Sequence, residues 1–293
     1  MSRSSDLVHP TAAIHPSAHI DPSARIGPAV VIEPEVIVGP HCVIGERTRL
    51  RARSIIVTHT TLGADNDVHP YAVLGGDPQD RSYDAARPGE LIVGDRNVIR
   101  EGVTFSRGNW NGPATRIGSG CYFMATSHVG HNAQVGDNVT MANYSGLAGH
   151  SRIGPGCVFS GYCGVHQFVD VGEGVMFRAH ASVSMHVPPF VIVGAGNFVS
   201  GLNKVGLHRN PGITKRDRDD LKEIYRAIYR DRSAASIEES LATLDGREWG
   251  PAAMRFLDFV RQAQTAQPPR KRGLCGSRRT VSRSTRLVTA EGD

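Results

Sequence analysis

The sequence predicts a mainly β protein, a parallel β-helix of hexapeptide repeats followed by a small α-helical C-terminal domain. From Ile117 to Val183 every sixth residue is large and apolar, without a miss. The same period runs through residues 8–74. Repeats of six residues are typical of parallel β-helices, in which three short strands complete a coil of 18 residues. A period of six excludes a helix, because it would scatter the apolar residues around a 3.6-residue cylinder.

The first run of repeats predicts four coils. Pro and Gly recur beside its apolar positions, where the chain must turn a corner every six residues. Each apolar residue points inward, since a strand buried on one face offers its large side chains to the core at a fixed period. The positions are Val8, Ile14, Ile20, Ile26, Ile32, Val38, Ile44, Leu50, Ile56, Leu62, Val68 and Leu74.

Two interruptions break the register and predict insertion loops, at about residues 75–92 and 106–116. Three repeats lie between them, at Val93, Ile99 and Phe105. With the twelve repeats of the second run, the chain contains 27 repeats, or about nine coils. We therefore expect a β-helix domain over residues 8–188, ended by the Pro188-Pro189 pair. Loops on a rigid scaffold are common places for function.

Residues 189–266 predict a connector and a helical C-terminal domain. Leu221, Ile224, Tyr225 and Ile228 follow helical spacing, and Thr214 is a suitable N-cap. Two further helices are expected at about 235–245 and 250–264. They would cover the open end of the β-helix, whose strand edges would otherwise be unpaired. Residues 267–293 are rich in Arg and predict a basic, disordered tail.

Charge and cysteine usage bear on partners and compartment. The formal charge of +5 resides in the tail, which has seven basic and two acidic residues, while the rest has 26 of each. The body therefore gives no sign of a nucleic-acid partner. The tail is interpreted as a solvated arm, with membrane-surface or nucleic-acid contact as alternatives. Four of the five cysteines occupy small inward-facing slots. We expect a reduced, cytoplasmic protein that does not span a membrane.

Four histidines are brought to one edge by the 18-residue coil. His131, His150 and His166 belong to repeats that are 18 residues apart, so they lie on one face of successive coils, about 5 Å apart. His128 ends the repeat just before, at the neighbouring corner. A neutral imidazole near pH 7 can take a proton from a hydroxyl, as a general base must.

Gly149 and Gln167 stack in the same column as His131. A glycine in the adjoining coil leaves a backbone N–H unobstructed, as an oxyanion hole requires. Zinc is the rival interpretation of a histidine cluster, but no carboxylate or thiolate supports it. The sequence also lacks a serine nucleophile elbow and a phosphate-binding glycine loop. We predict direct transfer onto a bound acceptor, with no metal and no cofactor.

In combination, these motifs resemble the acyl-[acyl-carrier-protein]–UDP-N-acetylglucosamine O-acyltransferases that begin lipid A biosynthesis. The similarity covers about residues 10–265, and the order of the motifs is more specific than the repeats alone. They are GGDPQD at 75–80, GDRNVIRE at 94–101, SHVGHN at 127–132, LAGH at 147–150, VHQF at 165–168 and VPP at 187–189.

The resemblance implies a left-handed β-helix that forms a homotrimer, with active sites between the prisms. It implies that His131 is the general base for the sugar 3-hydroxyl of UDP-N-acetylglucosamine, which attacks an acyl thioester on acyl carrier protein. Gly149 N–H would steady the oxyanion. The residues implied in substrate binding are Asp80, His128, His150, His166, Gln167, Asn203 and Arg209. The carrier protein would meet basic residues at Lys204, Arg209, Lys215 and Arg216.

The sequence departs from the family pattern at several positions. Ser82 replaces a common Lys, which removes a cationic contact to the nucleotide sugar, and Asn132 follows the expected base where Asp is usual. Residues 196–203 are two residues short, and Asn210-Pro211 replaces Arg-Gly. A 3-amino sugar acceptor is therefore an alternative. Ala179 matches the position that limits acyl length in the family, and it predicts a medium chain of about C10–C14.

Three other function classes share parts of this pattern. A CoA-dependent sugar or amino-acid O-acetyltransferase would use the same repeats with a different donor. A metal-dependent hydratase of the γ-carbonic-anhydrase kind would use the histidines as zinc ligands. A silent scaffold trimer would need none of them.

Overall fold

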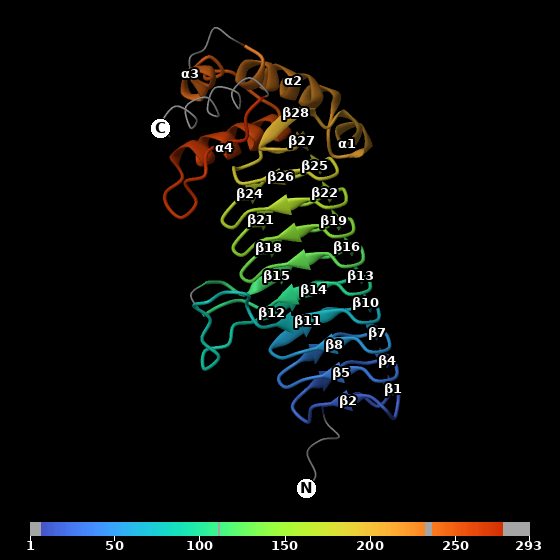
Figure 1. The fold of residues 1–293 in the computed structure, drawn as a ribbon. Coiled ribbons are helices and arrows are strands. Elements are labelled where there is room, and N and C mark those ends of the chain that lie inside the picture. Colours follow the sequence, from blue (N-terminus) through green and yellow to red (C-terminus); the bar gives the residue numbers. More distant parts are fainter. Residues whose placement is uncertain (1–6, 111, 232–235, 278–293) are drawn as a thin grey trace.

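The computed structural model describes residues 7–110, 112–231 and 236–277. It is a parallel β-solenoid of triangular cross-section with helices at its C-terminal end (Figure 1), which confirms the predicted fold class. Three walls of short strands run the length of the solenoid, and the chain visits them in turn. From β1 to β26, successive strands in a wall pair in parallel, and the partners are 18 residues apart except at the two insertions.

The first wall has eleven strands. In spatial order they are β1 (Ala13–Ile14), β4 (Val31–Ile32), β7 (Arg49–Leu50), β10 (Asp67–Val68), β13 (Val98–Ile99), β16 (Tyr122–Phe123), β19 (Thr140–Met141), β22 (Val158–Phe159), β25 (Met176–Phe177), β27 (Val191–Gly194) and β28 (Phe198–Leu202).

The second wall has nine strands and the third has eight. The second consists of β2 (His19–Ile20), β5 (Ile37–Val38), β8 (Ile55–Ile56), β11 (Val73–Gly76), β14 (Thr104–Ser106), β17 (His128–Val129), β20 (Gly146–Leu147), β23 (Gly164–Val165) and β26 (Ser182–Val183). The third consists of β3 (Arg25–Ile26), β6 (Val43–Ile44), β9 (Thr60–Leu62), β12 (Leu91–Val93), β15 (Thr115–Ile117), β18 (Gln134–Val135), β21 (Arg152–Ile153) and β24 (Asp170–Val171).

The repeat pattern explains both the core and the corners. In the two-residue strands the second residue, the apolar repeat position, faces the core, as in β3, where Ile26 is buried and Arg25 is exposed. The corner between the second and third walls places a residue in the left-handed region in successive coils, at Asn132, His150 and Phe168. This conformation costs a non-glycine residue about 1–2 kcal/mol, which the surrounding ladder of hydrogen bonds must offset.

Both insertions replace this same corner, in the two coils before His131. The first leaves the solenoid after β11 and returns at β12, and the second lies between β14 and β15 (Figure 1). The predicted insertions are confirmed, although the strands extend to Gly76 and Ser106 and so shorten the loops. His131, His150 and His166 follow one another along this corner and are here called the histidine column. Because both insertions occupy the same corner, the loops lie beside this column.

The solenoid continues past Pro188-Pro189, so the prediction that these prolines end the repeat is wrong. Val187 bridges Val171, and β27 pairs in parallel with β25. Only then does β28 turn back antiparallel to β27. The result is about ten turns, close to the nine that were expected. Proline is tolerated here because the pair lies in a corner, outside the strands.

Four helices follow in the part of the chain that the structure describes, α1 (Lys204–Arg209), α2 (Lys215–Tyr229), α3 (Ile237–Ala242) and α4 (Pro251–Thr265). The last three confirm the helices expected from the sequence, and α1 lies within the expected connector. Thr214 caps α2 in a reciprocal capping box with Asp217, as its position predicts. None of the helices in the described residues combines the length and the apolar character needed to cross a bilayer.

Residues 267–277, here called the C-terminal strap, contradict the prediction of disorder from residue 267 onward. Leu274 bridges His186 in parallel, and Gly276 bridges Phe198. Arg270 makes an ion pair with Asp170 at 2.5 Å. The strap is fixed to the last coils because its backbone completes β-bridges that the strand edges leave open. The rest of the predicted tail, residues 278–293, lies outside the described residues.

Candidate active site

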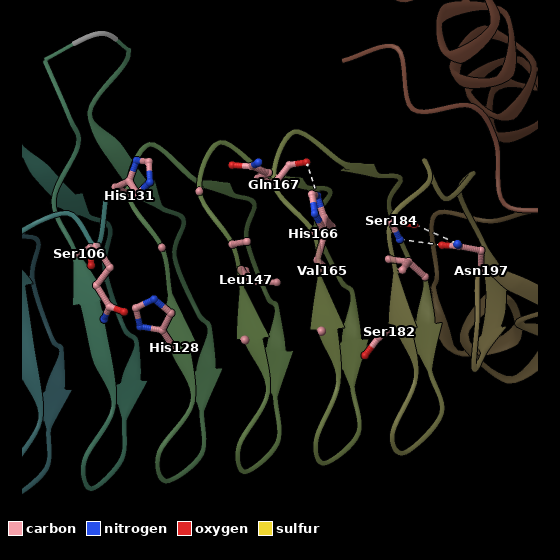
Figure 2. A pocket seen from close by; sticks show the side chains of 17 residues that line it. Ser106, His128, His131, Leu147, Val165, His166, Gln167, Ser182, Ser184 and Asn197 are labelled. Atoms are coloured by element: carbon pink, nitrogen blue, oxygen red, sulfur yellow. Dashed lines mark hydrogen bonds between the residues drawn. The ribbon is translucent and has the colours of Figure 1, made fainter. Parts of the chain in front are cut away.

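A groove of about 670 Å³ follows the edge between the second and third walls. Figure 2 shows its side chains projecting from successive coils along one edge. Its floor is glycine-rich, and four of the predicted site residues, His128, His131, His166 and Gln167, line it together with the backbone of Gly149. The other lining residues are Gln79, Ser106, Gly130, Gly146, Leu147, Ala148, Gly164, Val165, Ser182, Val183, Ser184 and Asn197.

His131 lies at the corner after β17, with only 9% of its surface exposed. Its Nδ1 is 2.8 Å from Asn132 Oδ1. The Asn132 amide is oriented by its other contacts, because its Nδ2 donates to the carbonyls of Asn109 and Pro113. Its oxygen must therefore accept a proton, so Nδ1 of His131 carries one and the neutral ring has a free lone pair at Nε2.

Gly149 lies directly against His131. A Cβ at Gly149 would be 2.5 Å from His131 Nε2, a distance that no side chain can occupy. Glycine is therefore required for the imidazole to take its position. No hydrogen bond from Gly149 N–H is formed within the described residues. The free lone pair of His131 and an unpaired backbone donor thus lie together at one point of the groove.

Asp80 reaches His131 from the first insertion, and its Oδ2 is 3.8 Å from His131 Nε2. Ser82 donates to Asp80 Oδ1 from its backbone N–H at 2.9 Å and from its hydroxyl at 3.0 Å. The bond from the Ser82 backbone lowers the pKa of Asp80 most, the bond from its hydroxyl adds to this, and burial opposes both. The carboxylate is charged at neutral pH, and Ser82 holds it in place instead of supplying a cation.

His150 lies beside His131 on the next coil. The two rings meet edge to face with centroids 5.2 Å apart, and His150 stacks on Phe168 at 4.7 Å. Burial lowers the pKa of His150, electrostatic interactions with His131 and Arg270 lower it further, and Asp80 opposes them. His150 therefore stays neutral at pH 7 and limits the space in which the His131 ring can rotate.

Figure 2 shows His128 in β17, on the strand that leads to His131, and His166 after β23, two coils further along. His128 Nδ1 is 2.8 Å from Thr104 Oγ1, and burial lowers its pKa. His166 is exposed, and its Nδ1 donates to the Gln167 carbonyl at 3.2 Å. Both rings leave Nε2 available to a ligand in the groove. Three of the four predicted histidines line the groove, and the fourth, His150, flanks it beside His131.

Three predicted site residues lie away from this groove in the chain described. Asn203 caps α1, where its side chain accepts from Gly206 N–H and donates to Gly174 O on the corner between the third and first walls. Arg209 is exposed at the end of α1. Ala179 is exposed on the corner between the first and second walls. Their roles stay predictions.

The structure adds residues that the sequence did not single out. Gln79 and Asn109 come from the insertions, and Asn197 lies in the turn between β27 and β28. Asn109 donates to Asp80 Oδ2 at 3.3 Å and, from its backbone, to Asn132 Oδ1 at 3.0 Å. Gln79 could have been found from its place next to Asp80. No local signal marks Asn109, since only the fold brings it to His131.

The residues that could bind metal are not arranged to do so. Across residues 7–110, 112–231 and 236–277, no three His, Cys, Asp or Glu side chains converge as metal ligands. The five cysteines are all free and buried. The geometry of the groove instead suits acid–base chemistry on a ligand lying along the histidine edge.

Comparisons with known proteins agree with this geometry. The model of domain 2 of UDP-N-acetylglucosamine O-acyltransferase matches residues 186–275, and the bacterial transferase hexapeptide model matches residues 114–149. Two solved structures are similar over 92% of this chain. The UDP-N-acetylglucosamine acyltransferase of Campylobacter jejuni has a TM-score of 0.77 and 29% identity, and that of Arabidopsis has 0.76 and 28%; both are covered completely.

Relatives with the name acyl-[acyl-carrier-protein]–UDP-N-acetylglucosamine O-acyltransferase are closer in sequence. The protein of Anaeromyxobacter sp. Fw109-5 is 42% identical over 188 residues, which are 64% of this chain and 72% of that protein. The protein of Herminiimonas arsenicoxydans is 35% identical over 214 residues, 72% of this chain and 79% of that one. The chain therefore belongs to the acyl-[acyl-carrier-protein]–UDP-N-acetylglucosamine O-acyltransferase family and is an acyltransferase.

Proposed function

We propose that this chain transfers a fatty acyl group, with a 3-hydroxyacyl group as the expected form, from acyl carrier protein to the 3-hydroxyl of UDP-N-acetylglucosamine, the first step of lipid A biosynthesis. The proposal rests on one observation: His131 Nε2, with its free lone pair, lies next to Gly149, whose backbone N–H makes no hydrogen bond within the described residues. Acyl transfer from a thioester needs a base for the acceptor and a donor for the oxyanion.

The reaction follows from these two groups. His131 Nε2 takes the proton of the sugar 3-hydroxyl as its oxygen attacks the thioester carbonyl. The carbonyl oxygen gains negative charge and accepts a hydrogen bond from Gly149 N–H. The tetrahedral intermediate then collapses, the C–S bond breaks, and the imidazolium returns its proton to the leaving thiolate. No covalent bond to the enzyme forms, and the base is regenerated.

Asp80 supports the charged state of the base. Its carboxylate lies 3.8 Å from Nε2, so it stabilises the imidazolium that forms during attack and accepts from a sugar hydroxyl in the ground state. Asn132 holds Nδ1 through a neutral oxygen, so the ring is oriented without a permanent negative partner there. His128, His150, His166 and Gln167 line or flank the path of the substrates along the groove.

The remaining expectations concern the oligomeric assembly, the docking of the carrier protein and the cellular location. Asn203 and Ala179 lie on the other two corners of the prism and Arg209 lies at the helical end, and a homotrimer would bring such surfaces against the groove of a neighbouring copy. Lys204, Arg209, Lys215 and Arg216 are exposed on the helical end, where an acidic carrier protein would dock. We expect the enzyme to work in the cytoplasm.

A product panel tests the proposal. Purified protein is incubated with acyl-carrier thioesters of different chain lengths, each paired with UDP-N-acetylglucosamine or its 3-amino analogue, and products are measured by mass. We expect an O-acylated nucleotide sugar with a medium-length chain. Formation of an amide with the amino analogue alone would assign the alternative acceptor. Turnover with acetyl-CoA and none with acyl carrier protein would contradict the proposal.

A further inference from the structure

The C-terminal strap places one guanidinium group behind the histidine column. Arg270 Nη2 donates to the His150 carbonyl at 2.7 Å, and Nη1 donates to Asp170 Oδ1 at 2.5 Å and to the Phe168 carbonyl at 3.4 Å. The Arg270 side chain of the C-terminal strap therefore holds the corners of two successive coils. Neither the repeats nor the family motifs include this residue.

The two carbonyls belong to the residues whose rings stack beside His131. His150 and Phe168 have φ angles of 59° and 62°, and their rings are stacked at an interplanar angle of 16°. The backbone on either side is tied to the reacting groups, because His150 N–H donates to the His131 carbonyl and Phe168 N–H donates to the Gly149 carbonyl. A shift of either corner would move His131 and the Gly149 amide.

The strap holds Arg270 rigidly. His186 Nδ1 accepts from Asp170 N–H, so its Nε2 carries a proton, which it donates to the Arg270 carbonyl at 2.6 Å. The His186 backbone pairs on both sides with the strap, at Gly273 and Cys275. Tyr229 of α2 donates its hydroxyl to the Cys275 carbonyl at 3.0 Å. The Arg270 side chain is accordingly 21% exposed.

We propose that Arg270 is a positioning residue for acyl transfer, which clamps the corners of His150 and Phe168 and thereby fixes His131 against the Gly149 amide. The planar guanidinium suits this role, since its fork can bond two carbonyls and a carboxylate at once. The proposal rests on the proposed function, because it assigns the reacting groups to His131 and Gly149. A misplacement of about 1 Å at such groups can cost on the order of 10²-fold in rate.

The charge of Arg270 offers a second readout. The groups that face the His150 ring are His131, Asp80 and Arg270, with Phe168 stacked on it. The positive charge of Arg270 lowers the pKa of His150, and Asp80 opposes it. Removing the guanidinium should therefore move the titration of His150, which a general loss of stability would not do.

The experiment compares three variants of the full chain. Arg270→Met keeps the side-chain length and removes the charge and the donors, and Arg270→Lys keeps the charge but cannot bond both carbonyls. Arg261→Met is the matched control, since Arg261 lies on the surface of α4, forms an ion pair with Asp245 and touches no residue of the groove. Steady-state kcat and KM are measured with acyl-carrier thioester and UDP-N-acetylglucosamine, and the His150 ring is followed by NMR between pH 5 and 8.

We expect Arg270→Met to lower kcat about tenfold with KM changed less than about twofold, and to raise the titration midpoint of His150. Arg270→Lys should lose rate while His150 titrates as in the parent, and Arg261→Met should match the parent in both. An unchanged kcat together with an unmoved His150 signal in Arg270→Met would overturn the proposal. If Arg270→Met does not fold, an Arg270→Lys variant with parental kcat overturns it. A parent without acyltransferase activity would refute the proposed function, while the NMR comparison would still decide the clamp.

Discussion

His131 is held by two neighbours that act in different ways. Asn132 fixes the tautomer by accepting from Nδ1, and its own amide is fixed by two carbonyls of the second insertion. Gly149 acts by the side chain it lacks, because even a methyl group would collide with Nε2. The proposed base and the proposed oxyanion donor are therefore adjacent for a steric reason that a single methyl group can test.

Gly149→Ala should lower kcat by about 10²-fold, because the new Cβ would push the imidazole away from the attacking hydroxyl. The measurement is kcat and KM for both substrates. Gly201→Ala is the matched control, since a Cβ at Gly201 in β28 would meet no atom within 4 Å. A Gly149→Ala enzyme with parental kcat would show that the close contact is not needed.

Two half-buried histidines give the protein a definite pH dependence. The pKa values of His128 and His150 are lowered by burial, so below the ordinary value of about 6.5 the unfolded chain binds more protons than the folded one. The free energy of unfolding should therefore fall as pH is lowered from 7 to 5. Denaturant titration at several pH values checks this, and His150→Gln should reduce the slope. A rise in stability over that interval would contradict the assigned shifts.

The two insertions act as one element. Each replaces the corner that His131 occupies in the following coil, and together they carry Asp80 and Asn109 to the base. Arg107, at the start of the second insertion, connects the two insertions. It is 4% exposed, donates to the Gly75 carbonyl at 2.9 Å, and contacts Tyr83 and Asp77 of the first loop. The position of Asp80 in the first insertion therefore depends on the buried guanidinium of Arg107 in the second.

Arg107→Ala should lower the free energy of unfolding by about 1.5–3 kcal/mol, the usual cost of losing hydrogen bonds to a charged group. It should also lower kcat/KM for the nucleotide sugar, because the loop that carries Asp80 loses its anchor. Arg81→Ala on the same loop is the control, since Arg81 is exposed and should change stability by less than about 0.5 kcal/mol. Equal effects of the two substitutions would contradict the anchoring role.

The molecule as a whole is a prism whose three corners carry different features. One corner carries the insertions and the histidine column, while Ala179 and the Asn203 cap lie on the other two. The helices close the C-terminal end (Figure 1), and the strap returns from them to the corner that carries His150. The residue expected to limit chain length, Ala179, and the expected substrate-binding residue Asn203 therefore lie on corners away from the groove of the chain described.

Much of this architecture could be predicted from the sequence, because a strict period of six converts residue number into height and face. The shared edge of His131, His150 and His166 follows from that period alone. The approach of Asp80 to His131 did not, since the path of an insertion is not periodic. Arg270 was missed because composition places it with the basic residues of the tail, and only the bridge at His186 shows that the strap is ordered.

The most direct test of the account is the rate of the chemical step in His131→Ala. Single-turnover acyl transfer is measured with saturating acyl-carrier thioester and UDP-N-acetylglucosamine, with His19→Ala, an exposed histidine of the first coils, as the control. If His131 is the general base, the rate constant should fall by about 10²–10⁴-fold with little change in substrate binding. A rate within about threefold of the parent would show that another group removes the proton.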